Sequence, residues 1–276
     1  MNATEKKQNI ISRRKLISTL GMTCFIMPPA YSFINQPKPN NRAPGTSGMK
    51  TIGILGGLGP QATLDLEAQI HLASQRLIPP QINSGYPPLV VAYHRRPPFV
   101  IKGDALVFPL QPDPELLELA KRLGAMADFI IIPSNGAHLV QKEIEQASGR
   151  KVLSMIDITL EEVARRKWRT VGVVGFKNAM VYIQKFSALG LVPATIDEAL
   201  QLKLDASIMR VMEGRDSAED HAVAIEVVYQ LRKQNVDGII PGCTEIPLLL
   251  KENLDTVGFV HPIQLLAEAA VKQAMA

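Results

Sequence analysis

Short apolar runs alternate along this chain with longer stretches of helical periodicity. Residues 50–56 and 169–175 are both β-branched, apolar runs that end in glycine, as a central strand of a parallel sheet does. Helical periodicity lies between such runs, at residues 115–126, 157–168 and 217–234. Asp113 followed by Pro114 is a helix-start signal for the first of these. The alternation predicts an α/β fold with parallel sheets covered by helices on both faces.

Two further segments repeat each other across the chain. Residues 128–135 and 237–244 each begin with aspartate, continue through a buried-strand pattern and carry a small polar or thiol residue six positions after the aspartate. Helix-like segments follow at residues 137–147 and 245–251. Ser134 and Cys243 are therefore expected at equivalent places, the carboxyl ends of equivalent strands. Two such pseudo-symmetric half-domains would place a ligand in the cleft between them.

The expected domain organisation follows from these repeats. Residues 50–156 together with 257–276 are assigned to the first half-domain, and residues 157–256 to the second. Residues 33–49 are rich in proline, glycine and asparagine, which predicts a flexible linker.

The N-terminal residues 1–32 are interpreted as a signal peptide. Arg13-Arg14-Lys15 precedes an uncharged stretch, residues 16–27, which is shorter than the ~20 residues of a membrane-spanning helix. The paired arginines resemble a twin-arginine signal, which predicts a periplasmic or extracellular protein. An uncleaved anchor, or a start at Met49, is the alternative interpretation.

Charge changes the picture of possible partners. The chain has 30 Lys and Arg against 26 Asp and Glu, and residues 1–32 hold five of the former and one of the latter. The remainder therefore carries 25 of each sign and is formally neutral. A nucleic-acid partner is not expected, nor is a membrane partner after signal removal. A homodimer is a possible assembly.

Cys243 is the strongest candidate for chemistry. It is the one cysteine that follows the expected signal peptide, and it precedes a predicted helix in Gly242-Cys243-Thr244-Glu245. A helix N-terminus lowers the pKa of a thiol, so a reactive thiolate is expected. The alternative is a buried, inert cysteine.

Several neighbours of the two candidate residues could bind a carboxylate. Asn135, Gly136 and Thr244 stand where two helix N-termini could cradle anions, or where Asn135 and Thr244 could only cap helices. His138 lies one turn after Ser134 and could act as an acid/base group or bond to the backbone. The histidines show no metal-ligand spacing, so no metal is expected.

Gly57 lies in a glycine-rich turn after the first strand. Gly57, Gly59 and Ala62 weakly fit a dinucleotide fingerprint, but Pro60 removes an amide where a pyrophosphate would bind. The turn is therefore interpreted as admitting a small anionic substrate.

The motifs together resemble the aspartate/glutamate/hydantoin racemase superfamily. Residues 50–60 resemble its opening strand and turn, Pro133-Ser134-Asn135-Gly136-Ala137-His138 resembles its first catalytic motif, and residues 242–249 resemble its second. The resemblance implies two α/β half-domains and chemistry without pyridoxal phosphate, metal or another cofactor. In that family two cysteines face the substrate α-carbon from opposite sides, one taking a proton and the other returning one.

The roles carried over by this resemblance are specific to residues. Cys243 would be the main acid/base group and Ser134 the group on the second face, where the family has cysteine. Asn135 and Thr244 would hold the α-carboxylate, with Gly136, Glu245 and Gly57 lining the site, and Lys203 would meet an acidic substrate side chain. Gly136 replaces a threonine, and Arg95-Arg96 only loosely resembles the arginine-bearing loop of the family.

Serine at position 134, in place of the family's first cysteine, leaves three functional hypotheses. A serine hydroxyl is far less acidic than a thiol of pKa ~8.5, so two-base racemisation should be impaired or one-directional. The leading hypothesis is an amino-acid racemase or epimerase acting on a small carboxylate or amino acid such as aspartate or glutamate. The alternatives are a single-cysteine decarboxylase or isomerase of the same superfamily, and a non-catalytic exported carboxylate-binding protein.

Overall fold

A computed structural model describes residues 48–80, 85–103, 105–251 and 258–276, all within one compact unit, Ala43–Ala276. The expected signal peptide and almost all of the expected linker lie outside the described residues. Within the described part, no helix is both long enough and apolar enough to span a membrane.

The first sheet has four parallel strands in the order β2-β1-β5-β6. Its strands are β1 (Ile52–Gly56), β2 (Leu89–Tyr93), β5 (Phe129–Ile131) and β6 (Val152–Leu153). The helical segments between and after them are α1 (Pro60–Leu77), α2 (Pro114–Met126), the 3₁₀ helix η1 (Gly136–Val140) and α3 (Gln141–Ser148). The first predicted strand and the helix after Asp113 are therefore confirmed, and the Asp113 carboxylate accepts the amides of Glu115 and Leu116 as a helix cap.

The second sheet has three parallel strands in the order β8-β7-β9. They are β7 (Thr170–Val174), β8 (Val192–Ala194) and β9 (Gly238–Pro241). The helical segments that follow β6 along the chain are α4 (Met155–Arg165), η2 (Phe176–Ala179), α5 (Met180–Phe186), η3 (Ser187–Leu189), α6 (Glu198–Met212), α7 (Ala218–Arg232), α8 (Ile246–Leu250) and α9 (Pro262–Met275). The predicted fold class, two parallel-sheet α/β halves, is confirmed.

The two aspartates of the internal repeat make equivalent backbone contacts. The Asp128 side chain accepts the amide of Thr51 at 2.7 Å, at the start of the first sheet's central strand. The Asp237 side chain accepts the amides of Arg169 and Thr170 at 2.6 and 2.9 Å in the second sheet. These amides lower the pKa of Asp237. Each aspartate thus fixes the start of its own strand against the start of the neighbouring strand. The motifs that follow the two strands therefore begin from equivalent positions.

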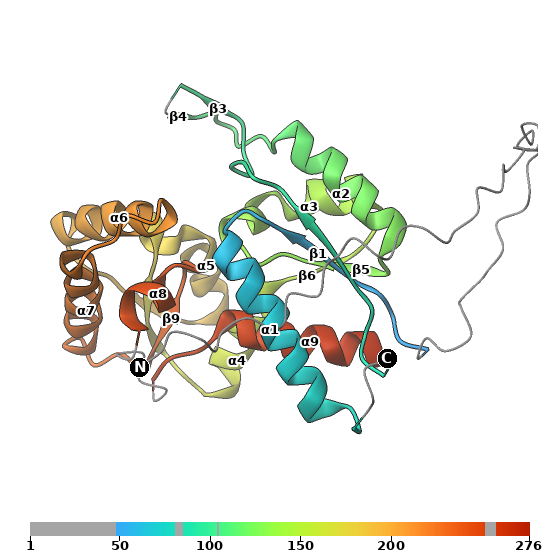
Figure 1. Ribbon diagram of the computed structural model, residues 1–276. Coiled ribbons are helices and arrows are strands. Elements are labelled where there is room, and N and C mark those ends of the chain that lie inside the picture. Colours follow the sequence, from blue (N-terminus) through green and yellow to red (C-terminus); the bar gives the residue numbers. More distant parts are fainter. Residues whose placement is uncertain (1–47, 81–84, 104, 252–257) are drawn as a thin grey trace, which may run out of the picture. The chain divides into compact units, whose positions relative to one another are not determined.

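Alternate residues of the first sheet face different helices, as the two-residue period of a strand requires. Ile52 and Ile54 of β1 pack with α1 and α9, whereas Ile130 of β5 packs with α2 and α3. Figure 1 shows α1 and α9 on one face of this sheet and α2 and α3 on the other. The sheet is therefore buried on both faces.

The second sheet is covered in the same manner. Val174 and Ile239 pack with α6, α7 and α8, while Val173 and Ile240 pack with α4 and α5. After Phe259, which pairs with Ile239 at the edge of this sheet, the chain returns to the first half as α9. Helices thus cover both sheets: α9 packs on the first sheet, and α4 contributes side chains to the cores of both.

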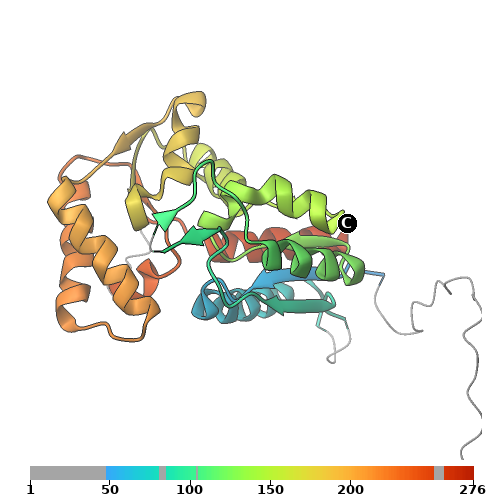
Figure 2. The same ribbon diagram turned by 90° about the horizontal axis from the view of Figure 1, so that it is seen from above.

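Two predicted helices differ in their starts. The helix expected at residues 157–168 begins at Met155, because Ser154 accepts the Asp157 amide as its cap. The helix expected at residues 137–147 begins as the 3₁₀ segment η1 and becomes α-helical only in α3. A short hairpin, β3 (Ile101–Lys102) with β4 (Ala105–Leu106), was not predicted; Figures 1 and 2 show it projecting away from the helices that cover the first sheet.

Trp168 lies directly over the backbone of β9. A β-carbon placed on Gly238 would lie 2.1 Å from the Trp168 ring, so only glycine fits there. The Arg166 guanidinium lies 5.1 Å from the ring centroid. The indole therefore contacts both a cation and a strand backbone.

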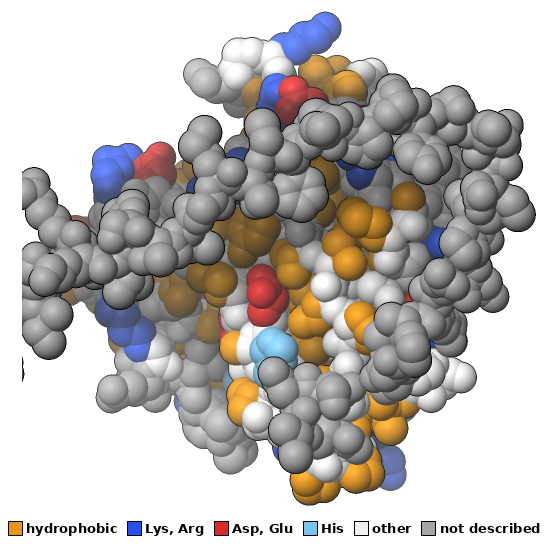
Figure 3. All heavy atoms as spheres, turned by 45° about the vertical axis from the view of Figure 1, so that its right-hand side comes forward, with side chains coloured by type: hydrophobic (Ala, Val, Ile, Leu, Met, Phe, Trp, Pro, Cys, Tyr) orange, Lys and Arg blue, Asp and Glu red, His pale blue; other side chains and the backbone are white. Residues whose placement is uncertain are grey.

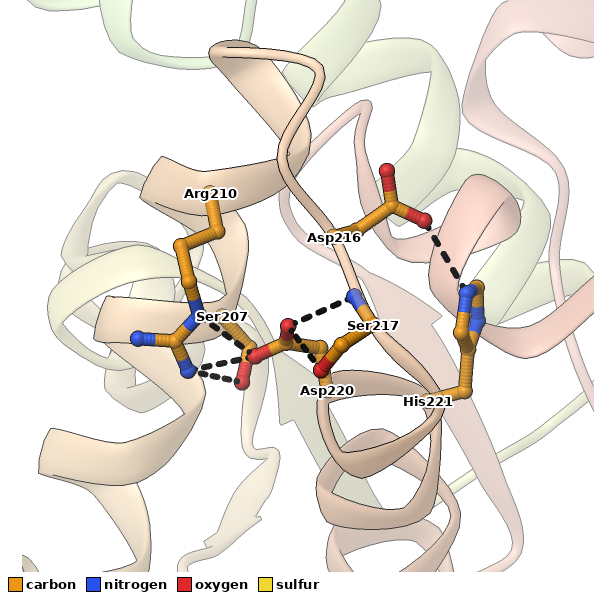
Figure 4. Close-up of polar contacts among 6 residues, drawn as sticks. All are labelled: Ser207, Arg210, Asp216, Ser217, Asp220 and His221. Atoms are coloured by element: carbon orange, nitrogen blue, oxygen red, sulfur yellow. Dashed lines mark hydrogen bonds and ion pairs between the residues drawn. The ribbon is translucent and has the colours of Figure 1, made fainter.

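A buried carboxylate joins α6 to α7 (Figure 4). Asp220 is fully buried and accepts the Arg210 Nε at 2.8 Å together with the amide and hydroxyl of Ser217. The Arg210 guanidinium holds the pKa of Asp220 well below its usual range, against the opposing effect of burial. In the same view His221 contacts Asp216 at 3.0 Å, and its other ring nitrogen contacts the carbonyl oxygen of Leu249 in α8 at 2.7 Å.

Replacing Asp220 with asparagine keeps the shape of this side chain and removes its charge. We expect the free energy of unfolding at pH 7 to fall by about 1–3 kcal/mol, because a charge-assisted capping contact is lost. The native pKa is depressed, so the charge stabilises the fold above the ordinary carboxyl pKa of ~3.9 and loses this effect as the pH falls below that value. Urea unfolding at pH 7 and pH 3 measures both effects. An equal difference between Asp220→Asn and the unsubstituted protein at the two pH values would contradict the assignment, and Glu213→Gln serves as an exposed control.

Candidate active site

The two repeated motifs lie at the carboxyl end of one strand in each sheet. Ser134 and Asn135 follow β5, and Cys243 and Thr244 follow β9. Both strands lie beside the first strand of their sheet, β1 or β7. The equivalence expected from the sequence is therefore present in the topology, and both Ser134 and Cys243 are partly exposed.

Cys243 forms a thiol–carboxylate pair with Glu245. The Cys243 thiol donates to Glu245 Oε2 at 2.9 Å, and the Thr244 hydroxyl donates to the same oxygen at 3.1 Å. Glu245 is only 6% exposed, so its charge is screened poorly by water. A buried carboxylate that accepts two hydrogen bonds holds the thiol in its protonated form.

The expectation that Cys243 has a lowered pKa is wrong. Burial raises the pKa of the thiol well above its usual value, and the negative charge of Glu245 and its hydrogen bond raise it further. The backbone N–H groups of Glu245 and Phe176 act in the opposite direction and lower the pKa of the thiol. The helix that follows, α8, has only five residues, so its dipole does not outweigh a carboxylate in hydrogen-bond contact.

The turn between β1 and α1 touches this pair from the first half. A β-carbon placed on Gly59 would lie 3.0 Å from Glu245 Oε1 and 3.7 Å from the Thr244 hydroxyl oxygen. The predicted site residue Gly57 has a φ of +81°, and a β-carbon there would lie 2.8 Å from the His94 backbone nitrogen. The Gly57 amide donates to the Thr63 hydroxyl at 2.9 Å, so it is not available to a substrate in this state. The turn shapes the site by close backbone approach.

Asn135 of the first half makes a hydrogen bond with the second half. Its Oδ1 accepts the hydroxyl of Tyr182, from α5, at 2.8 Å. Its Nδ2 is buried and has no hydrogen-bond partner among the described residues. The interpretation that Asn135 and Thr244 cap helices is wrong, since neither η1 nor α8 has a side-chain cap bond. An unpaired buried donor costs about 1–3 kcal/mol, so a ligand acceptor would fit this amide.

His138 has a structural position. Its Nδ1 donates to the Ser134 carbonyl oxygen at 2.8 Å, and its Nε2 accepts the Met155 amide at 3.2 Å. Burial lowers the pKa of His138 to about 4, so the ring is neutral at pH 7. Both ring nitrogens are occupied by backbone groups, which favours the backbone-bonding alternative over a role on substrate. Gly136 beside it has open space, because a β-carbon there would meet nothing within 4 Å.

The basic residues suggested by the sequence lie differently. Lys203 is exposed on α6, and the side chains of α6 that reach the turn behind Cys243 are Gln201 and Asp205. Arg96 forms an ion pair with Glu115 and lies 3.8 Å from Asp113. Its charge is therefore compensated within the protein.

Sequence reasoning missed four residues of this region. Tyr182 bonds to Asn135, Gln201 to the Gly175 carbonyl, and Thr63 to the Gly57 amide. His94 is a buried histidine whose Nε2 has no hydrogen-bond partner within the described part. Each lies far in sequence from the motif that it supports or inside a helix, and a buried polar residue in a helix gives only a faint signal in one sequence.

Two cavities lie away from these residues. Cavities of about 530 and 670 Å³ follow α4 and α9, with Ile158, Glu161 and Lys272 lining both. Their linings are mixed in charge and contain none of the motif residues. The chemical contacts, and not cavity size, therefore define the candidate site. In the part of the chain that is described, no group of three or more His, Cys, Asp and Glu side chains could hold a metal ion.

One face of the molecule shows how its charged side chains are distributed. On the face shown in Figure 3, Lys and Arg side chains are dispersed around the edges and do not gather into a patch. Hydrophobic side chains and an adjoining acidic and histidine pair occupy the centre of this view.

Two parallel α/β halves whose equivalent strands end in a thiol and a hydroxyl define a racemase-type α/β protein. The chain belongs to the Asp/Glu/Hydantoin racemase family, whose model matches residues 55–270.

Individual relatives agree with this assignment. The chain is 23% identical over 228 residues to the broad specificity amino-acid racemase RacX of Bacillus subtilis (strain 168), a match that covers 82% of this chain and 98% of RacX. Picrophilus torridus aspartate racemase has a TM-score of 0.66 at 22% identity, over 82% of this chain and 94% of that one. PH1733, an aspartate racemase homologue from Pyrococcus horikoshii OT3, has a TM-score of 0.62 at 22% identity, over 83% and 100%. These structures share the fold.

Replacing Glu245 with glutamine tests the thiol–carboxylate pair without a substrate. We expect the pKa of Cys243 to fall, because the adjacent negative charge is lost, and the alkylation rate at pH 8 to rise about tenfold. Iodoacetamide labelling of Cys243, followed by peptide mass spectrometry from pH 6 to 10, measures this. Glu226→Gln, on the exposed side of α7, is the matched control. An unchanged profile in Glu245→Gln would show that the carboxylate does not set the thiol's protonation.

Proposed function

We propose that the protein is a cofactor-independent amino-acid racemase or epimerase in which Cys243 and Glu245 share the proton-transfer work on one face of the substrate. The observation that carries this proposal is the 2.9 Å hydrogen bond from the Cys243 thiol to the buried Glu245 carboxylate. The family, and the amino-acid racemase activity named for RacX, support an amino acid as substrate. The aspartate racemases of the same fold suggest an acidic one as the first choice.

The substrate carboxylate would be held by groups with hydrogen-bonding capacity to spare. The unpaired Asn135 Nδ2 can donate to it, and the Thr244 hydroxyl can turn from Glu245 toward it. Two donors on the α-carboxylate stabilise the negative charge that develops when the α-proton leaves. This contribution is needed because an α-proton beside a carboxylate is very weakly acidic.

The proposed proton transfers return every group to its starting state. The Cys243 thiol passes its proton to Glu245, and the thiolate then takes the substrate α-proton, so that an S–H bond forms while the C–H electrons move into the carboxylate as an enediolate. A water beside Ser134 donates a proton to the opposite face of the carbon. The hydroxide that remains receives the proton from Glu245 through solvent, and the carbon has been inverted.

The second face supplies much weaker acid/base chemistry. The side chains that contact this strand end are His138, which is neutral at pH 7, and Tyr182, whose pKa burial raises far above its usual value. Neither can accept a proton readily, and a serine hydroxyl is a poor base. We therefore infer that exchange on the Cys243 face, with retention, outpaces inversion.

The raised pKa of Cys243 favours a second candidate function. A thiol that keeps its proton is an acid, and a decarboxylase needs one proton donor on one face. Loss of carbon dioxide from a substituted malonate would leave an enediolate, Cys243 would protonate its carbon, and Glu245 would direct a solvent proton back to sulfur.

Solvent exchange at the α-carbon tests the first function. We expect proton-to-deuterium exchange with L- or D-aspartate, glutamate or another amino acid of a panel, detected by NMR in deuterated water. Cys243→Ala should lower the exchange rate at least about 100-fold, because the acid/base group is gone. Ser134→Cys should raise the ratio of inversion to exchange, since a thiol would then face each side.

Three results separate the functions. Carbon dioxide release from a substituted malonate, dependent on Cys243 and without amino-acid exchange, would replace racemisation by decarboxylation. Binding of a carboxylate ligand with unchanged affinity in Cys243→Ser, and with no turnover, would indicate a non-catalytic binding protein. Absence of exchange across the panel, including in Ser134→Cys, would remove the racemase proposal.

We also propose export to the periplasm or the extracellular space, on the basis of the basic and apolar pattern of residues 1–32. The expected mature N-terminus lies near Phe33. N-terminal sequencing of the protein from an extracytoplasmic fraction would measure this, and a full-length product found only in the cytosol would contradict it.

A further inference from the structure

A buried hydrogen bond between Asn135 and Tyr182 joins the two halves. The Tyr182 hydroxyl, on α5, donates to Oδ1 of Asn135, which follows β5, at 2.8 Å. The Tyr182 side chain is fully buried, and Asn135 is only 5% exposed. Water therefore competes poorly for this bond. Burial also raises the pKa of Tyr182 far above its usual value, so the phenol keeps the proton that it donates.

This bond selects one orientation of the Asn135 amide. An asparagine amide has an acceptor side and a donor side, and a half-turn about the last side-chain bond exchanges them. Because the phenol donates to Oδ1, the amide nitrogen Nδ2 is directed elsewhere, and it is buried without a hydrogen-bond partner among the described residues. A half-turn would present Oδ1 in its place, and an oxygen repels a carboxylate. The phenol therefore decides whether Asn135 attracts or repels an anionic group.

The helix that carries Tyr182 is packed against the Cys243 motif. It follows β7 through the turn η2, and a β-carbon placed on Gly175 at the start of this turn would lie 3.1 Å from the Cys243 nitrogen. Ala179, the last residue before α5, leaves no room for a side chain at Gly242. Tyr182 lies three positions after Ala179, in the first turn of α5. Its hydrogen bond therefore ties Asn135 to the segment that bears the sulfur.

We propose that Tyr182 is a positioning residue for Asn135: its hydroxyl keeps the Asn135 Nδ2 available to the substrate carboxylate and holds it at a set distance from the Cys243 motif. This inference rests on the proposed function, in which Asn135 binds the carboxylate and Cys243 acts on the α-carbon. The carboxylate donor belongs to the first half and the acid/base group to the second. A bond between the halves thus aligns two groups that must act on one substrate.

Tyr182→Phe in the full chain removes the hydroxyl and keeps the buried ring. We expect the Kd of L-aspartate, measured by saturation-transfer NMR titration at pH 7, to rise about 5–10-fold, because the Asn135 amide is no longer held in one orientation. The Kd of acetate, a bare carboxylate, should rise by a similar factor. Tyr229→Phe, at an exposed tyrosine of α7, is the matched control and should leave both constants unchanged.

A double-mutant cycle separates positioning from a general structural effect. If Tyr182 acts through Asn135, Tyr182→Phe should change the Kd of L-aspartate less than about twofold when Asn135→Ala is already present. An equal loss of affinity in both backgrounds, or an unchanged Kd in Tyr182→Phe, would overturn the inference. So would the absence of L-aspartate and acetate binding to the unsubstituted protein. Tyr182→Met, which fills the buried space without a hydroxyl, repeats the test if Tyr182→Phe does not fold.

Binding and turnover distinguish this inference from the proposed function. In amino-acid exchange, Tyr182→Phe should lower kcat/KM by at least the factor seen in Kd, since a misplaced donor also fails to stabilise the developing negative charge. A protein that binds L-aspartate through this pair but exchanges no α-proton would disprove the function and leave the positioning role in place. Equal exchange in Tyr182→Phe and the unsubstituted protein would support the function and remove the positioning role.

Discussion

The hydrogen bond from the Cys243 thiol to the Glu245 carboxylate is the interaction on which the rest of this site depends. A thiol alone at the end of β9 would be a small apolar side chain, and a carboxylate alone at 6% exposure would be a costly buried charge. Placed 2.9 Å apart, each satisfies the other. Gly59 of the first half approaches this pair closely, so both halves shape the surroundings of one hydrogen bond.

Local sequence patterns predicted the architecture because they reflect local physics. The repeated segments that begin at Asp128 and Asp237 predicted two equivalent strands. An aspartate precedes each strand because its carboxylate accepts amides at the start of the neighbouring strand. Apolar runs that end in glycine likewise marked β1 and β7. The periodicity placed the start of α4 two residues late, because Ser154 caps the helix and Met155 begins it.

The site was only half predictable, for a physical reason. The motif residues Cys243, Asn135 and Ser134 could be chosen from sequence because their spacing repeats. The protonation of Cys243 could not, since it depends on whether a carboxylate two residues away turns toward the sulfur or toward water. Tyr182 and Gln201 were missed because their partners are 47 and 26 positions away in the chain. His138 was correctly predicted to lie near Ser134, but both of its ring nitrogens bond to the backbone, which gives it a structural role.

The position of Trp168 gives this protein an internal optical probe. The chain has a single tryptophan, and its ring rests on the backbone of Gly238 in β9, the strand that leads to the Cys243 motif. The ring also lies near the Arg166 guanidinium, whose Nη1 donates to the Phe259 carbonyl next to the same strand. Tryptophan fluorescence, excited at a wavelength that tyrosines do not absorb, therefore reports on the second half. A spectral change on mixing with a small molecule would locate the response in the sheet that carries the sulfur, and an event confined to the first half would leave the tryptophan emission unchanged.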